Sequence, residues 1–184
     1  VKSQDFYVGL YADNLSQNYY PAYVPWQTMS LYRLYRITGD ERYLDAVFTI
    51  NDELVTIHQV EKPFYLDTWG RWFVPEHPEY GSPHSSSTGV YLEGVTYAYE
   101  LAREAGDVER AERYLRSVRL AALNLMNLQF ADAGDMYYLG NPGRVYGGVK
   151  TGVFQNSIRV DTTQHASDAF TKILEVFSED EFEG

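Results

Sequence analysis

The sequence predicts an all-α fold, built as an array of αα-hairpins. Three observations carry this prediction. Two segments repeat the order of an apolar helix, a Gly-Asp pair and an amphipathic helix, a third helical pattern begins at Asp161, and the turns within the repeats are much shorter than the connections between them. Short turns are typical of antiparallel neighbouring helices. We therefore expect the 184 residues to fold as one domain of packed hairpins.

The first hairpin is predicted from residues 26–57. Its first helix, residues 26–37, has little polar surface, which is typical of a helix that is enclosed on most sides. Gly39 can adopt the left-handed conformation that ends a helix, and Asp40 can cap the helix that follows. Over residues 44–57 apolar side chains recur close to helical spacing among polar ones, so this second helix is expected to bury one face.

The second hairpin repeats this pattern. It has an apolar helix over residues 90–102, the pair Gly106-Asp107, and a strongly amphipathic helix over residues 111–126. Aligning Gly39 with Gly106 superposes three further pairs of identical residues, which indicates a modest internal repeat. These pairs are Tyr32 with Tyr99, Leu34 with Leu101, and Arg36 with Arg103.

A third, unfinished unit is predicted from Asp161 onward. The run Asp161-Thr162-Thr163-Gln164 fits a capping box, and apolar residues then recur at helical spacing up to Phe177. An acidic tail follows this helix.

The connections between the units are long, at about 28 residues around 58–85 and about 30 residues around 130–160. Because a loop longer than ~12–15 residues usually has a role of its own, we expect both connections to be functional. If consecutive helices are antiparallel, both connections and the Tyr-rich segment 6–23 lie on the same rim. Residues 149–160 combine β-branched and aromatic side chains with Gly-rich turns, which predicts a small β-hairpin within the second connection.

Two stretches of the chain resemble a known superfamily. Residues 31–44 (LYRLYRITGDERYL), and residues 86–94 (SSTGVYLEG) leading into 98–102 (AYELA), resemble hairpins of the six-hairpin glycosidase-like superfamily of (α/α) toroids. The resemblance is one of pattern and covers most of residues 21–177. It implies a partial (α/α) toroid whose site lies at the N-terminal rim of the inner helices. Members include glycoside hydrolases, polysaccharide lyases and sugar epimerases.

The chain supplies fewer hairpins than a complete toroid. We therefore expect residues 1–184 to be a single toroid-like domain that forms a C-terminal portion or fragment of a larger toroid. The remainder would come from further chain or from a second subunit.

Composition excludes several other classes of function. The net charge of −11 repels nucleic acid and anionic lipid, and no apolar run approaches the roughly 20 residues that span a bilayer. The absence of cysteine excludes disulfides and thiolate sites but does not identify the compartment. We find no phosphate-binding or dinucleotide motif, so no cofactor is expected. The spacing of Glu76, His77, Glu79 and His84 follows no ligand rule, so no metal site is expected either.

Aromatic residues are concentrated on the predicted rim. Aromatic faces pack against the C–H faces of sugar rings, so these residues are candidates for binding carbohydrate. The alternative is that they form small cores within the long loops. The candidates are Tyr19, Tyr20, Trp26, Trp69, Trp72 and Tyr138.

Two polar groups are candidates for catalysis. Glu93 lies within an apolar stretch, where burial would raise its pKa, and His84 precedes the same helix. The alternative is a buried glutamate tied to an arginine or a tyrosine, with a Ser/Thr cap before it.

The second group lies at the start of the last inner helix. Arg159 and the free N–H groups of the helix could hold a carboxylate or an oxyanion, and His165 could transfer a proton. Asp161 and Gln164 would contact substrate beside them. The alternative is structural, with Asp161 as the cap, Gln164 completing the box and Arg159 paired with Asp161.

The sequence thus favours a carbohydrate-active enzyme that acts on an oligo- or polysaccharide. The reaction type is open among hydrolysis, elimination and epimerisation. The alternative is an α-solenoid interaction module without catalysis, because residues 98–126 also resemble tetratricopeptide-type helix pairs. Two long connections on one rim count against that module.

Overall fold

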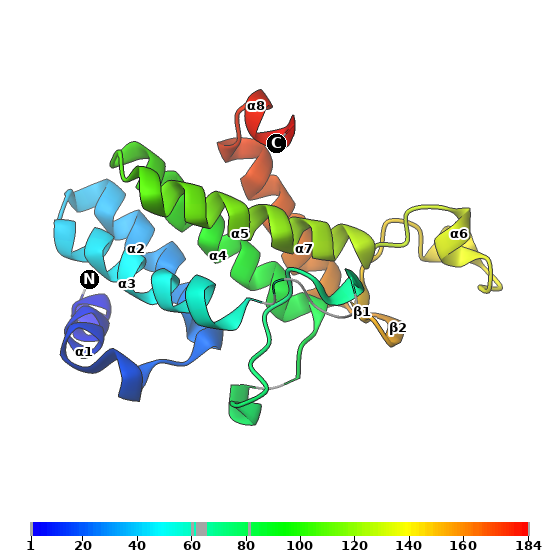
Figure 1. The fold of residues 1–184 in the computed structure, drawn as a ribbon, viewed down its shortest axis with the longest axis horizontal. Coiled ribbons are helices and arrows are strands. Elements are labelled where there is room, and N and C mark those ends of the chain that lie inside the picture. The colour runs from blue at the N-terminus through cyan, green and yellow to red at the C-terminus, as the bar shows by residue number, and fades with distance from the viewer. Residues whose placement is uncertain (1, 60, 62–65, 81, 184) are drawn as a thin grey trace.

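The computed structural model describes residues 2–59, 61, 66–80 and 82–183, and the predicted helical fold with one small β-hairpin is confirmed (Figure 1). Its α-helices are α1 (Lys2–Asn18), α2 (Val24–Thr38), α3 (Glu41–His58), α4 (Ser85–Glu104), α5 (Val108–Asn127), α6 (Ala133–Met136), α7 (Val160–Val176) and α8 (Glu179–Glu183). Short 3-10 helices are η1 (Pro21–Tyr23), η2 (Leu66–Thr68), η3 (Pro78–Tyr80) and η4 (Pro142–Arg144). The antiparallel strands are β1 (Lys150–Gly152) and β2 (Gln155–Ile158).

Both Gly-Asp turns have the predicted geometry. Gly39 and Gly106 have φ angles of 68° and 71°, in the left-handed region that glycine tolerates best. The Asp40 side chain accepts a hydrogen bond from the Arg42 N–H, and the Asp107 side chain accepts one from the Arg110 N–H. These turns fold α2 against α3 and α4 against α5 as antiparallel hairpins.

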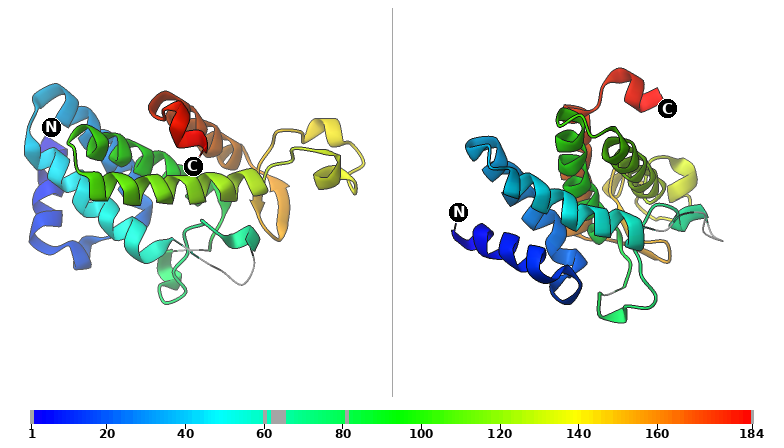
Figure 2. Two further views of the ribbon diagram at one scale, coloured as in Figure 1. Left: turned by 45° about the horizontal axis from the view of Figure 1, so that its top comes forward. Right: turned by 60° about the vertical axis from the view of Figure 1, so that its left-hand side comes forward.

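The long helices form two layers. In the first layer α4 lies between α2 and α7. The second layer consists of α3, which packs on α2, and α5, which packs on α4 (Figures 1 and 2). Two glycines of α4 allow the close approach. A β-carbon at Gly89 would lie 2.9 Å from the carbonyl carbon of His165, and one at Gly94 would lie 2.7 Å from the Cα of Pro25. These contacts position α2, α4 and α7 around the site described below.

Most of the N-terminal segment is a helix that packs on the fold, although the sequence placed it on the rim with the long connections. Residues 2–18 form α1, which packs on α3 through the buried Tyr11 and a 2.7 Å hydrogen bond from the Tyr43 hydroxyl to Asp5. The helical pattern is weak because polar and apolar residues do not separate onto two faces, and the helix is kinked at Asn14. Only residues 19–23 of the Tyr-rich stretch remain at the rim.

The beginning of α7 also differs from the expected capping box. The helix begins at Val160, and the Thr162 hydroxyl accepts a 3.1 Å hydrogen bond from the Arg159 N–H and contacts the Val149 carbonyl at 3.1 Å. Asp161 lies within the first turn, and Gln164 is exposed on the next. The N-cap position is therefore Arg159, two residues before the predicted Asp161, and Asp161 instead accepts a 3.0 Å hydrogen bond from the Thr162 N–H within the first turn.

The three irregular segments meet at the N-terminal ends of α2, α4 and α7. The Tyr20 hydroxyl donates a 3.1 Å hydrogen bond to the Glu79 carbonyl, so the link before α2 contacts the first long connection. At the start of α4, the Ser85 hydroxyl donates a 2.6 Å hydrogen bond to the Lys150 carbonyl of the β-hairpin. The part of the second connection that holds α6 extends away from the helices (Figures 1 and 2).

Candidate functional site

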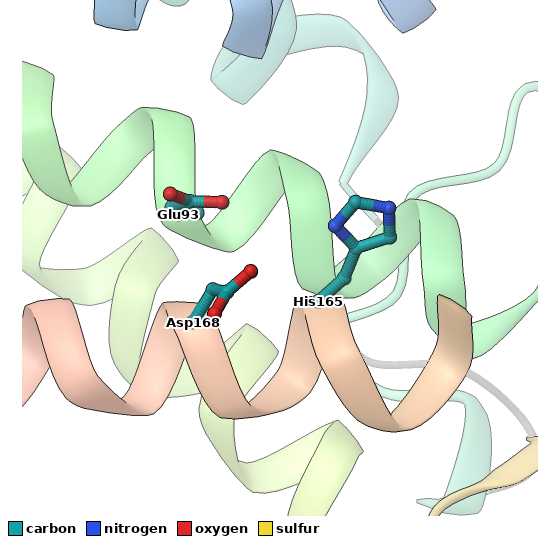
Figure 3. Close-up of side chains that lie close together, drawn as sticks. All are labelled: Glu93, His165 and Asp168. Carbon is teal, nitrogen blue, oxygen red and sulfur yellow. The ribbon is translucent and has the colours of Figure 1, made fainter. Parts of the chain in front are cut away.

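Three side chains that can bind a proton or a metal converge between α4 and α7. Glu93 comes from α4, while His165 and Asp168 are one turn apart on α7 (Figure 3). One carboxylate oxygen of each acid and one ring nitrogen of His165 all lie within 4.8 Å of one another. Gly89, one turn before Glu93, lets α4 approach the backbone of His165 and so sets this spacing.

These three side chains lack polar partners among the residues that the structure describes. None of them forms a hydrogen bond or an ion pair with another residue in the described part of the chain. The Nδ1 atom of His165 is buried and unpaired, although buried polar atoms are rarely left so. Figure 3 shows this nitrogen, the one next to Cγ, on the side of the ring that faces the two carboxylates. The three groups are therefore available to a ligand.

The electrostatics of Glu93 reflect this arrangement. Burial, and after it the negative charge of Asp168, raise the pKa of Glu93 above its ordinary value. Arg33 and Lys172 oppose the shift from a distance. Lys172 is itself held by Glu100, with Nζ and Oε2 at 2.8 Å, so its charge is already paired. The predicted rise in the pKa of Glu93 is thus confirmed. The alternative, in which Glu93 pairs with an arginine or a tyrosine, is not found among the described residues.

An exposed aromatic surface adjoins the three groups. The Trp26 side chain is 51% exposed, and its ring meets the His165 ring edge to face with centroids 5.8 Å apart. Tyr23, one turn earlier, is also exposed, and its ring lies 5.2 Å from that of Tyr20. Tyr20 in turn meets Tyr80 of the first connection at 5.5 Å. Contacts between aromatic rings therefore run from Tyr80 of the first connection to Tyr23, three residues before Trp26.

A second group of polar residues lies at the first turns of α4 and α7. His84 caps α4, since its Nδ1 accepts a hydrogen bond from the Ser87 N–H at 3.2 Å. Burial, and after it the charge of Arg159, lower the pKa of His84. Arg159 is paired with Asp161 by two contacts of 2.9 and 2.7 Å, as the structural alternative predicted. Burial acts to raise the pKa of Asp161, but hydrogen bonds from Arg159 and Ser86 lower it below its ordinary value.

The other candidate residues lie apart from the three groups. Trp72 is only 4% exposed, and its indole donates a 3.2 Å hydrogen bond to the Leu54 carbonyl, so its ring belongs to the core. Trp69 is partly exposed, with a buried indole nitrogen. Tyr138 lies on the extended segment beside Tyr137. Tyr19 is half-buried and packs against the core.

The rim also contains a hollow. It lies between the link before α2, the first connection and the first turns of α4, and its lining includes Pro21, Tyr80 and Tyr91. At about 20 Å³ this hollow has room for a water molecule but not for a sugar ring.

Sequence reasoning identified Glu93, His165 and Trp26 but missed Asp168. The available signal was spacing, because residues three apart on a helix share a face, and His165 and Asp168 are three apart. Nothing in the sequence placed Glu93 of α4 opposite them, since that pairing depends on how α4 packs against α7.

Comparisons with known proteins give no family for this chain. No protein-family model, curated protein or solved structure matches it. In the described part of the chain, none of the helices is both long and apolar enough to cross a membrane.

Proposed function

We propose that this chain is a carbohydrate-active domain whose reacting centre is formed by Glu93, His165 and Asp168. One observation carries the proposal: the exposed indole of Trp26 adjoins two unpaired carboxylates and an unpaired imidazole at the rim where the irregular segments meet. A flat apolar ring beside groups that hydrogen-bond hydroxyls is the combination that sugar rings require.

The substrate in this proposal is an oligo- or polysaccharide rather than a single sugar. The rings of Tyr23, Tyr20 and Tyr80 contact one another in turn, and exposed Trp26 follows Tyr23 by three residues. A row of this kind offers successive packing surfaces to successive sugar units. Hydrolysis, elimination and epimerisation all remain open as the reaction.

The fold in this proposal is an arc of an (α/α) toroid. The layer of α2, α4 and α7 corresponds to inner helices, and the layer of α3 and α5 to outer ones. All three inner helices begin at the rim that carries the candidate site. This agreement between layer order and site position supports the resemblance seen in the sequence.

A binding experiment tests the proposal. The chain is screened against neutral and uronic oligosaccharides, and affinity for the best ligand is measured for the wild type, Trp26→Ala and Tyr137→Ala. Loss of a stacking ring should weaken binding by at least about tenfold in Trp26→Ala. Tyr137→Ala removes a ring that is 84% exposed on the extended segment, and it should bind like the wild type.

An activity experiment tests the reacting groups on the same ligand. Glu93→Gln should lower turnover by about 100-fold or more, which is typical of losing a group that transfers protons. Glu109→Gln, in which the replaced side chain is 90% exposed at the start of α5, should leave turnover unchanged. If no oligosaccharide binds to the wild type, the proposal fails and the interaction module becomes the better hypothesis.

A further inference from the structure

We propose that Glu93, His165 and Asp168 form a binding site for a divalent transition-metal cation, with Zn²⁺ as the best match. The inference goes beyond the proposed function, because a cation can bind here whatever the substrate is. It rests on the convergence of three ligand groups, on their lack of partners and on the identity of their donor atoms.

The geometry is close to that of a three-ligand site. Ligands of a tetrahedral zinc ion stand about 3.3 Å apart at bond lengths of about 2.0–2.1 Å. The donor atoms of Glu93, His165 and Asp168 lie within 4.8 Å of one another, a difference that small side-chain rotations can close. His165 and Asp168 share one face of α7, so only Glu93 has to be supplied from a second helix.

The local charge also favours a cation. Two carboxylates face each other without an ion pair to any described residue, and the nearby Lys172 is engaged by Glu100 at 2.8 Å. Farther along α4, Glu100 is paired with Lys172 of α7 and with Arg36 of α2. A bound cation would neutralise the repulsion between Glu93 and Asp168. It would also give the buried Nδ1 of His165 the partner it lacks.

The donor set selects the class of metal. One imidazole nitrogen with two carboxylate oxygens suits Zn²⁺ and neighbouring first-row cations, whereas Mg²⁺ and Ca²⁺ prefer ligand sets made of oxygen alone. Three protein ligands leave at least one coordination position open, which is typical of catalytic rather than structural zinc.

The open position would be directed away from the core. Asp168 is exposed and Glu93 and His165 are half-buried, so solvent reaches the group, and exposed Trp26 adjoins His165. A water molecule, a sugar hydroxyl or a uronate oxygen could occupy that position. The metal would then hold the substrate oxygen beside the ring on which the sugar packs.

The test is a titration of the chelator-treated chain with zinc chloride, followed by calorimetry and by a thermal melt. The wild type should bind one zinc ion per chain. At a hundredfold excess over the dissociation constant, its melting temperature should rise by about 5 °C or more. X-ray absorption at the zinc edge should show nitrogen and oxygen ligands at about 2.0–2.2 Å.

Three variants and one control assign the site. Asp168→Asn, His165→Asn and Glu93→Gln should each weaken zinc binding by about 100-fold or more, because each removes one of three protein ligands. Asp168 is exposed, so its variant should fold and melt like the metal-free wild type. His77→Asn is the matched control, since His77 lies 2.7 Å from Glu79 in an exposed pair outside the site, and it should bind zinc normally.

Two results would overturn the inference. One is the absence of saturable one-to-one binding of zinc or manganese to the wild type. The other is zinc binding that survives Asp168→Asn and His165→Asn but is lost in His77→Asn. Because all of these measurements are made without sugar, they stand apart from the oligosaccharide screen, and either proposal can fail alone.

Discussion

Two helix interfaces in this molecule treat carboxylates in opposite ways. Between α3 and α5, Asp52 accepts hydrogen bonds from Arg110 at 3.0 Å, from the Tyr114 hydroxyl at 2.6 Å, and from Arg113. Between α4 and α7, Glu93 and Asp168 face each other and engage no described residue in a hydrogen bond or ion pair. Asp52 therefore joins the helices at the first interface. At the second, Glu100 of α4 pairs with Lys172 of α7 at 2.8 Å, but Glu93 and Asp168 join nothing that the structure describes.

The difference concerns the stability that the same chemical group contributes in two settings. A carboxylate that is fully paired stabilises the fold, and removing it leaves its partners without an acceptor. A carboxylate that is held near another without a partner costs stability, and such costs are concentrated at functional sites. The α3–α5 interface is therefore the reference against which the α4–α7 site can be tested, from the largest expected effect to the smallest.

The largest effect is expected from closing the gap that Gly89 leaves between α4 and α7. In Gly89→Ala the new methyl group would lie 2.9 Å from the His165 carbonyl carbon, so the helices must separate. We expect a loss of about 3 kcal/mol in the free energy of unfolding, measured by urea denaturation. Zinc binding should weaken as well, because His165 moves.

Gly9→Ala is the matched control, since a β-carbon at Gly9 in α1 meets nothing within 4 Å. Alanine is the better helix former, so this variant should be as stable as the wild type or up to about 1 kcal/mol more stable. If Gly89→Ala behaved like Gly9→Ala, the close approach of α4 and α7 would be refuted.

The next effect is expected at the paired interface. Asp52→Asn removes the charge that Arg110 and Arg113 share and weakens the acceptor of the buried Tyr114 hydroxyl. Because the arginines are partly exposed, we expect a loss of about 2 kcal/mol, below the range for fully buried pairs. Asp45→Asn, on an exposed position of the same helix, should change stability by less than about 0.5 kcal/mol in the same denaturation experiment.

A smaller effect, of opposite sign, is expected at the unpaired site. Asp168→Asn in chelator-treated buffer removes a negative charge that faces Glu93, so it should leave stability unchanged or raise it by about 0.5 kcal/mol. A thermal melt of the metal-free variant measures this change. A loss as large as that of Asp52→Asn would show that Asp168 has a structural partner, and the contrast between the interfaces would disappear.

A similarly small effect, which depends on pH, is expected at Asp107. The backbone N–H and then the side chain of Arg110 lower the pKa of Asp107 in the folded chain. The contribution of Asp107 to the free energy of unfolding is therefore present above its unfolded pKa of about 3.9. It is lost as the pH falls through the lower pKa of the folded chain. Asp107→Asn should be about 0.5 kcal/mol less stable at pH 7. This difference should vanish in strong acid, and a constant difference across the titration would contradict the assignment.

The sequence was informative where local rules decide the structure. The Gly39-Asp40 and Gly106-Asp107 turns follow from backbone preference and capping, and the stripe of α5 follows from helical periodicity. The segment of α1 gave no such signal because its apolar residues do not gather on one face, and its helix depends on packing against α3.

The site was predictable only in part for the same reason. Glu93 could be recognised as a charge within an apolar helix, and Trp26 and His165 as rim residues. Their meeting with Asp168 depends on the distance and rotation between α4 and α7, which neither helix specifies alone. The burial of Trp72 was likewise outside the reach of composition, because a tryptophan near a loop can face either the core or the solvent.

The two glycines of α4 give this helix a further property. Gly89 meets α7 and Gly94 meets α2 through main-chain atoms, so the separation of the three helices does not depend on the side chains that project between them. Replacing those side chains should leave the dimensions of the frame intact. A different set of ligand groups could therefore be designed by changing positions 93, 165 and 168 alone, with the surrounding scaffold kept as it is.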